Sequence, residues 1–203
     1  MTKKLKKDFF LRDDVVQIAK DLVGKKIITA INGQKTAGYI TETEAYAGKG
    51  DQACHAHLGR FTKRTKVMYE TGGIAYVYLC YGIHHLFNII TNKKNNADAV
   101  LIRAIEPTDG IDLMLERRNM EKLKKNISSG PGNVSQALGI TKQYNAQSIL
   151  KNDIKIYETE HQPQLVADKR IGIGYAGDDV NLLWRFYDDD SKYVSKKVKR
   201  GKG

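Results

Sequence analysis

The segment KIITAINGQKTAGYITETEAY, residues 26–46, decides the fold class. Its first part, Lys26 to Ile31, is rich in β-branched side chains, which favour a strand. Asn32-Gly33 follows, the residue pair that a type I′ turn demands, because both central residues of that turn need positive φ. Thr36 to Tyr46 continues as a long strand, so the segment predicts an antiparallel hairpin.

Further elements are predicted on both sides of this hairpin. Asp13-Asp14 precede apolar residues at helical spacing, and Gly24 supplies a stop, which predicts a helix from Val15 to Leu22. Strands are predicted at 75–81, 86–91, 99–105, 170–175 and 182–187, and helices at 111–118 and 133–138. Because many strands follow one another through short turns, we expect an α+β fold: a single mixed domain around a curved, largely antiparallel β-sheet with peripheral helices.

The charge balance narrows the class of partner. The 203 residues include 34 Lys+Arg and 23 Asp+Glu, a formal charge of +11, which excludes an ordinary acidic cytosolic enzyme. Nucleic acid is the commonest partner of such a surface, although a basic surface can also serve solubility alone. With no repeat and no Gly/Ser linker, residues 1–203 are predicted to form one domain, with 1–8 and 191–203 as loose basic tails.

Cysteine usage and hydropathy bear on the compartment. Cys54 and Cys80 are too few for a disulfide scaffold and are interpreted as buried free thiols in a reducing compartment. The basic N-terminal residues are followed by the charged residues Lys6, Lys7 and Asp8 instead of an apolar stretch, so no signal peptide is predicted. The longest apolar run, 74–81, is far too short to span a membrane. We therefore expect a cytoplasmic protein that does not enter a membrane.

A group of carboxylates and a tyrosine lies on the second hairpin strand. Strand alternation places Glu42, Glu44 and Tyr46 on one face, with Glu44 and Tyr46 about 7 Å apart. That spacing would let a carboxylate act on a sugar carbon while the ring stacks on the attached base. A solvent-exposed strand face would produce the same pattern without any function.

Tyrosines form a second group, at 76, 78 and 81. Burial in the strand is the better interpretation for Tyr76. Tyr81 precedes Gly82 at the expected tip of a hairpin, where a ring is hard to bury. Rings projecting from a basic surface are what base stacking and wedge insertion require.

A metal site is a weak interpretation of Cys54-His55-Ala56-His57. A structural zinc needs four N/S ligands and a hydrolytic zinc three plus water. Neither His161 nor a His-x-x-x-His pair supplies the missing ligands at a recognised spacing, so no metal is predicted.

These groups, in this order and at these intervals, resemble the alkyladenine (3-methyladenine) DNA glycosylase family, of the mammalian alkyladenine type. The resemblance covers about residues 9–190 and depends on the conjunction of ordered motifs. The matching segments are 9–10, 22–24, 40–46, 51–55, 76–82, 87–89, 100–107, 129–132, 136–138 and 170–174.

The resemblance implies a catalytic pair. Glu44 matches the general base that activates the water, and Arg103 matches the residue that positions the same water and carboxylate. Cleavage of an N-glycosidic bond passes through an oxocarbenium-like sugar, which a carboxylate stabilises while it deprotonates the nucleophile. No metal or organic cofactor is implied.

The resemblance also implies how the base is held. Tyr46 would stack on one face of the extruded base, and His55 and Tyr78 on the other. Tyr81 would be the wedge that fills the gap in the DNA stack, and Asn88 would lie at the pocket floor and obstruct the exocyclic amine of guanine.

The expected activity is that of a monofunctional DNA glycosylase in base excision repair. It would excise alkylated or deaminated purines (3-methyladenine, 7-methylguanine, hypoxanthine) from duplex DNA, acting as a monomer by base flipping and water attack. His84-His85, beside the wedge, depart from the family pattern, since vertebrate members carry Met and Tyr there. Candidate phosphate contacts are Lys63, Arg64, Lys66, Lys93, Lys94, Arg117, Arg118 and Lys142.

Two other classes of function stay open from the residues alone. A non-catalytic RNA- or ribosome-binding module would use the basic surface and the tyrosines for stacking, but it has no need of Glu44 and Arg103. A small-molecule glycoside or nucleoside hydrolase would use Glu42 with Glu44 as an acid/base pair, but it leaves the +11 charge and Tyr81 unexplained.

Overall fold

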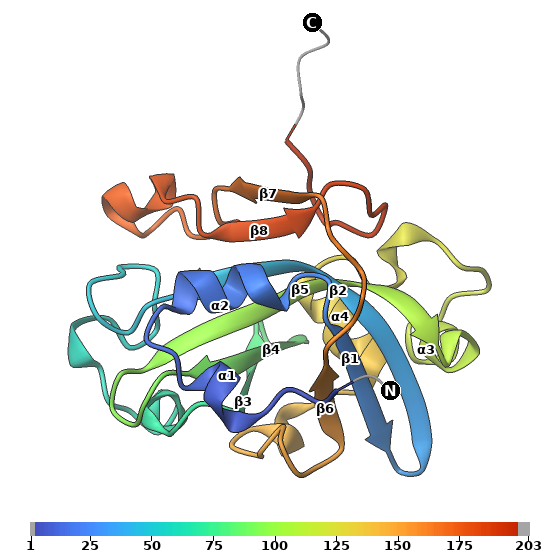
Figure 1. Cartoon of the computed structure of the whole chain (residues 1–203), viewed down its shortest axis with the longest axis horizontal. Coiled ribbons are helices and arrows are strands. Elements are labelled where there is room, and N and C mark those ends of the chain that lie inside the picture. Colours follow the sequence, from blue (N-terminus) through green and yellow to red (C-terminus); the bar gives the residue numbers. More distant parts are fainter. Residues whose placement is uncertain (1–2, 199–203) are drawn as a thin grey trace, which may run out of the picture.

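A computed structural model describes residues 3–198 of the chain. Eight strands in this range form one sheet in which β3-β4-β5-β2-β1-β6 are neighbours, with β8 on β2 and β7 on β8, and every pair is antiparallel (Figure 1). The strands are β1 (Lys26–Ile31), β2 (Gln34–Tyr46), β3 (Ile74–Cys80), β4 (His84–Thr91), β5 (Asp98–Asp109), β6 (Ile154–Tyr157), β7 (Leu165–Asp168) and β8 (Arg185–Asp188). The predicted α+β fold with a largely antiparallel sheet is confirmed.

The β1–β2 hairpin is the centre of this sheet. Asn32 and Gly33 have φ of 52° and 75°, as the type I′ turn requires, and Ile31 pairs with Gln34. The long strand β2 pairs with β5 along one edge; along the other edge its first part pairs with β1 and its last part with β8. The end of β2 is therefore enclosed by β5 and β8.

Helices cover the sheet. The α-helices are α1 (Lys7–Phe10), α2 (Val15–Leu22), α3 (Ile111–Arg117) and α4 (Pro131–Leu138), and short 3-10 helices lie at His57–Gly59, Lys66–Tyr69, Lys125–Ile127, Lys142–Tyr144 and Gly177–Asn181. Asp14 caps the start of helix α2, and its side chain accepts a hydrogen bond from the Gln17 N–H at 2.8 Å. The apolar face of α2 is buried, and the Thr43 hydroxyl of β2 donates to the Ala19 carbonyl at 2.8 Å. Thr43 thus faces α2, and its neighbours on β2 face the opposite side of the sheet.

Three apolar clusters make the core. The largest joins α2, α4 and the central strands, with Ile18, Ile102 and Leu138 among its fully buried members. A second lies under the irregular segment 47–73 and includes Met68. A third, of Ala53, Ile173 and Ala176, holds the segment 169–184 against that segment. The two smaller clusters anchor loops beside the end of β2, where the candidate site lies.

Several predicted elements differ from the structure. Residues 170–175 form a loop instead of a strand, the strand predicted at 182–187 is limited to Arg185–Asp188, and α1, β6 and β7 were not predicted. The prediction of loose tails is wrong for the described parts of both tails that carry apolar side chains. Leu5, Tyr193 and Val194 are buried, and burial of these side chains holds the chain against the core. Residues 1–2 and 199–203, also in those predicted tails, lie outside the described residues.

Within residues 3–198, no helix has the length and apolar character needed to cross a membrane.

Candidate active site

Irregular pairing between β2 and β5 shapes the site. Ile40 pairs with Ile105 and Glu42 with Ala104, but Thr43 pairs with Ile102, so Arg103 is an extra residue on β5. Such a bulge re-aims a side chain. It brings the Arg103 guanidinium to the face of the sheet that carries the two glutamates.

Glu44 is completely buried and hydrogen-bonded on both oxygens. Its Oε2 accepts the Tyr46 hydroxyl at 2.7 Å and lies 3.3 Å from Nη1 of Arg103. Its Oε1 accepts the backbone N–H of Ile171 at 2.7 Å. Tyr46, Arg103 and Ile171 all line a cleft, so the carboxylate lies directly behind the cleft wall. This burial excludes the alternative of a solvent-exposed strand face.

Arg103 is held between two carboxylates. Its Nε donates to Glu42 Oε1 at 3.2 Å while Nη1 faces Glu44. Burial alone would lower the pKa of Arg103, but the charges of Glu44 and Glu42 outweigh it and raise that pKa. The guanidinium is therefore a fixed positive charge at the cleft.

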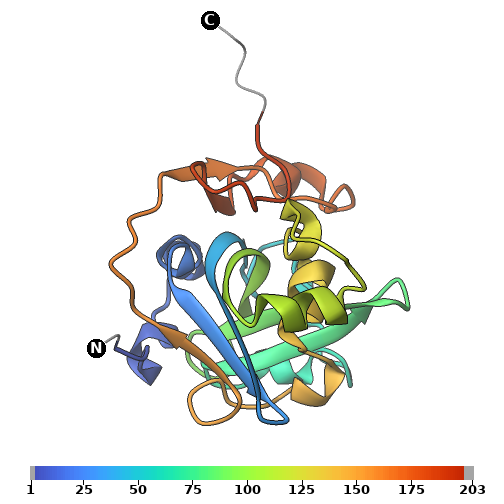
Figure 2. The ribbon, with the colours of Figure 1, turned by 90° about the vertical axis from the view of Figure 1, so that its right-hand side faces the viewer.

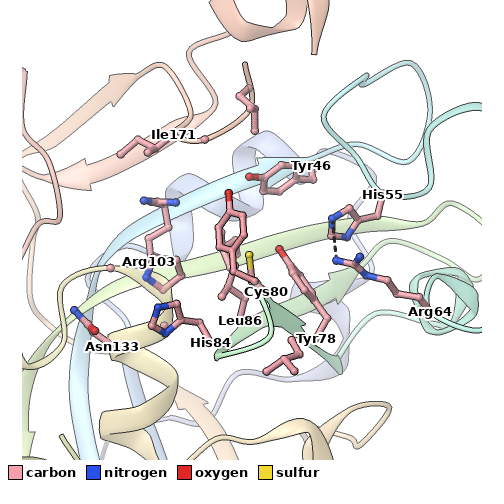
Figure 3. A pocket seen from close by; sticks show the side chains of 18 of the residues that line it. Tyr46, His55, Arg64, Tyr78, Cys80, His84, Leu86, Arg103, Asn133 and Ile171 are labelled. Carbon is pink, nitrogen blue, oxygen red and sulfur yellow. Dashed lines mark hydrogen bonds between the residues drawn. The ribbon is translucent and has the colours of Figure 1, made fainter. Parts of the chain in front are cut away.

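The cleft has a volume of about 490 Å³, and tyrosine and histidine rings form part of its lining (Figure 3). In the figure, Tyr46, His55 and Tyr78 reach it from separate elements. A smaller inner chamber of about 40 Å³ shares these three residues and includes Asn88. The cleft lining includes Tyr46, His55, Arg64, Tyr78, Tyr81, His84, Leu86, Leu101, Arg103, Asn133, Ile171, Gly172 and Tyr175. The structure thus brings together every site residue that the sequence analysis named.

Tyr46 links the carboxylate to the cleft. Burial, followed by the neighbouring charge of Glu44, raises the pKa of Tyr46 well above its ordinary value, so its hydroxyl stays protonated and donates to Glu44. The Arg170 guanidinium lies 4.9 Å from the centre of its ring. Arg170 in turn makes a two-pronged pair with Asp51, at 2.6 and 2.8 Å, in which both side chains are fully buried.

His55 is held as a neutral ring. Burial, followed by the charges of Arg64 and Arg60, lowers the pKa of His55 to about 4. Its Nδ1 lies 2.9 Å from the Tyr76 hydroxyl and its Nε2 lies 3.3 Å from Nη2 of Arg64. Because arginine can only donate, Nε2 accepts and Nδ1 carries the proton. The His55 and Tyr78 rings meet edge to face, with centroids 4.8 Å apart.

Tyr81 lies at the tip of the β3–β4 hairpin, which extends from the body of the molecule on the right of Figure 2. Tyr81 and Gly82 have φ of 50° and 74°, and 90% of the Tyr81 surface is exposed. A positive φ at an aromatic residue costs free energy and is common at functional sites. Tyr76, by contrast, is buried, as predicted.

Asn88 and the two histidines lie on β4, with His84 and His85 next to the tip of the hairpin. Asn88 is buried on β4 and its amide donates to the Tyr76 carbonyl at 3.2 Å. His84 is exposed and its ring packs over Gly132 at the start of α4, where a Cβ would meet it at 3.0 Å. His85 is half-buried.

The candidate phosphate contacts fall into two groups. Arg117 and Arg118 are half-buried and donate to the Ala137 and Ile127 carbonyls, so they hold α4 and the segment before it. These two arginines are therefore structural in this state. The others are exposed: Lys63, Arg64, Lys66, Lys93, Lys94 and Lys142.

Sequence reasoning missed the loop that completes the shell of Glu44. The Ile171 N–H, the Asp51–Arg170 pair and Tyr175, whose hydroxyl donates to the Ala53 carbonyl at 3.2 Å, all lie beside the cleft. The motif match at 170–174 was visible in the sequence, but a predicted strand there would not have placed a free N–H against Glu44.

Metal ligands are not grouped in the described part of the chain. Among residues 3–198, no three His, Cys, Asp or Glu side chains are arranged to hold a metal ion. Cys54 is buried, and burial raises the pKa of its thiol to about 12.

Comparison with known proteins identifies the family. Residues 8–192 match the family model described as methylpurine-DNA glycosylase (MPG). A Clostridium novyi protein is 45% identical over 202 residues, covering 96% of this chain and 100% of its own length, and a Chlamydia felis protein is 46% identical over 183 residues, covering 90% and 94%. A Natranaerobius thermophilus protein is 42% identical over 197 residues, covering 95% and 98%.

All three relatives carry the name "Putative 3-methyladenine DNA glycosylase". The sequence resemblance pointed to the mammalian alkyladenine type, but these relatives are bacterial, so the comparisons support the family and not specifically its mammalian type. The chain belongs to the methylpurine-DNA glycosylase family and is a DNA N-glycosylase, a hydrolase that acts in the repair of alkylated bases.

Proposed function

We propose that the chain excises 3-methyladenine, 7-methylguanine and hypoxanthine from duplex DNA by flipping the damaged nucleotide into the cleft. The observation that carries the proposal is the buried Glu44–Arg103 pair directly behind a cleft lined in part by rings. In a non-catalytic RNA-binding module this buried pair would have no function, and a free-nucleoside hydrolase would not need the exposed Tyr81.

Glu44 is the general base in this mechanism. It removes a proton from a water molecule as the N-glycosidic bond breaks, and its charge stabilises the oxocarbenium-like sugar. Arg103 positions both the carboxylate and the water. The positive charge of Arg103 is shared between Glu42 and Glu44, so Arg103 can orient Glu44 and the water without neutralising the negative charge of Glu44.

Access to Glu44 requires one covering group to move. Tyr46 is the group that a flipped base would meet, because it lines both the cleft and the inner chamber. We infer that stacking of the base on Tyr46 draws its hydroxyl from Glu44 Oε2, which leaves that oxygen to the water. The base itself completes the site.

The rings select the base. Tyr46 stacks on one face of the purine, and His55 and Tyr78 lie against the other, an arrangement that favours electron-poor alkylated rings. Asn88 lines the inner chamber, where it obstructs the exocyclic amine of guanine. Because His55 is neutral, it adds no positive charge against a cationic base.

Tyr81 and the basic surface hold the duplex. Tyr81 enters the stack in place of the flipped base, and the exposed residues Lys63, Arg64 and Lys66 lie on a loop that reaches the cleft through Arg64. We propose that the chain binds as a monomer, with a site of at most about 12 base pairs, since a domain of this size is about 43 Å across. Affinity should fall steeply between 50 and 200 mM salt.

The reaction stops at base release. The residues that line the cleft within 3–198 include no lysine whose amine could form a covalent adduct with the sugar. We therefore propose a monofunctional glycosylase that starts base excision repair and leaves an abasic site.

One assay tests this function. A duplex with a single hypoxanthine or ethenoadenine is incubated with the protein and free base is quantified, beside the free nucleoside and an undamaged duplex. We expect release from the lesion duplex alone. Release from the nucleoside at a similar rate would instead identify a nucleoside hydrolase, and binding without release would identify a binding module.

A further inference from the structure

The mechanism above uses Glu42 only to offset part of the charge of Arg103, yet Glu42, like Asp51, accepts four hydrogen bonds. It is fully buried. Its Oε1 accepts from Arg103 Nε at 3.2 Å, Arg185 Nη1 at 2.9 Å and the Ser195 hydroxyl at 2.8 Å, and its Oε2 accepts the Ser195 N–H at 2.7 Å. A buried carboxylate is costly unless its oxygens are hydrogen-bonded, and the four donors around Glu42 offset that cost.

The hydrogen bond to Glu42 fixes the direction of Arg103. A guanidinium is planar, so holding its Nε edge also sets where its terminal nitrogens point. In Arg103 the Nε edge is held by Glu42, and Nη1 then faces Glu44 Oε2. A rotation at Glu42 would move the charge that orients Glu44.

Glu42 is itself held from the far end of the chain. We call residues 191–198 the C-terminal segment. Tyr193 and Val194 bury it in the protein, and Ser195 supplies two of the four donors to Glu42. Arg185 reinforces the connection, because its Nη1 also donates to the Lys196 carbonyl at 2.7 Å.

We propose that Glu42 and Ser195 form a positioning pair, through which the C-terminal segment holds Arg103 in register with Glu44. The inference rests on the proposed function, since it concerns the same carboxylate–guanidinium pair. Neither residue touches the substrate. Their effect is on the rate of the chemical step and not on DNA affinity.

The chemistry of Glu42 allows a clean substitution. All four of its partners are donors, and only a carboxylate accepts on both oxygens. In Glu42→Gln the amide oxygen can accept at only one of the two oxygen positions. The NH2 group at the other position is a donor, so it faces either the Ser195 N–H or the three donors at Oε1 and leaves them without an acceptor. The substitution keeps the side-chain volume but removes part of the hydrogen bonding that fixes Arg103 and Ser195 to residue 42.

The test separates rate from binding. Single-turnover release of hypoxanthine is measured with protein in excess, and affinity is measured on a duplex carrying a 2′-fluoro hypoxanthine nucleotide, which resists cleavage. We expect Glu42→Gln to slow release by about 100-fold, the cost of a small misplacement in an active site, and Ser195→Ala by about 3- to 10-fold. Affinity should stay within about twofold for both.

Coupling and rescue identify the pair. If the two residues act through one contact, the double variant is no slower than Glu42→Gln alone. Ser195→Thr, which keeps both donors, should restore the parent rate. The matched control is Ser191→Ala, because the Ser191 hydroxyl donates to Glu106 at 2.9 Å within the same segment and has no contact with Glu42.

The outcomes distinguish the two proposals. A parent chain that releases no base from any lesion duplex refutes the proposed function and the inference with it. An active parent whose folded Glu42→Gln and Ser195→Ala variants keep the parent rate refutes the inference alone, as does an equal loss in Ser191→Ala. If Glu42→Gln does not fold, the rates of Ser195→Ala and Ser195→Thr decide.

Discussion

Glu44→Gln is the most direct test of the mechanism. The substitution keeps the side chain's size and an oxygen that can accept the Ile171 N–H, but it removes the proton acceptor and the negative charge. A developing positive charge about 4 Å from that carboxylate interacts with it by about 4 kcal/mol at an effective dielectric constant of about 20. That free energy corresponds to about 10³ in rate, within the 10²–10⁴ that a positioned base contributes.

The protein should fold after this change. Arg103 remains paired with Glu42, so Glu44→Gln does not leave an isolated buried charge. Single-turnover release of hypoxanthine from a duplex is the assay, with lesion affinity and thermal unfolding measured beside it. The matched control is Glu116→Gln on the exposed surface of α3, which should excise at the parent rate.

Tyr46→Phe sharpens the same test. It removes the hydroxyl that covers Glu44 Oε2 at 2.7 Å but keeps the ring for stacking and the carboxylate as base. We expect excision within about tenfold of the parent rate, far above that of Glu44→Gln. A Glu44→Gln protein that is folded, binds lesion duplex and still releases hypoxanthine at the parent rate would refute the reasoning.

The remaining predictions concern the wedge, the neutral histidine and a buried ion pair. Tyr81→Ala should weaken binding to lesion duplex by about 1–3 kcal/mol, the value of one stacking contact, and leave undamaged DNA nearly unaffected; equal losses on both duplexes would mark Tyr81 as structural. His55 should titrate at a pKa of about 4 in an NMR experiment, and a midpoint near 6.5 would contradict its burial. Because the folded pKa is lower than the unfolded one, His55 contributes a loss of stability as pH falls from about 6.5 to about 4, and none above that window. Arg170→Met strands the buried Asp51 carboxylate and should lower the free energy of unfolding by about 3–5 kcal/mol in urea titration; a change below about 1 kcal/mol would show that the pair is dispensable.

Local chemistry alone determined the centre of the fold. The turn at Asn32-Gly33 and the cap at Asp14 depend on residues within a few positions of one another, so the sequence predicts the β1–β2 hairpin and α2. The prediction that Glu44 and Tyr46 share a strand face is confirmed by the 2.7 Å hydrogen bond between them. Motif matching pointed to Arg103, although no local rule places its side chain beside Glu44.

Tertiary structure decided what surrounds that pair. The bulge that turns Arg103 toward Glu44 arises from the mismatch of β2 with β5, which no single strand encodes. Residues 170–175 have strand-like composition but form a loop, because Arg170 finds its partner in Asp51, 119 positions away. In the sequence, Glu42 was assigned a role only in the hydrolase alternative, as the acid/base partner of Glu44. The hydrogen-bond partner of Glu42, Ser195, lies 153 positions along the chain, and a contact over such a separation exists only once the sheet has formed and the C-terminal segment has packed against it.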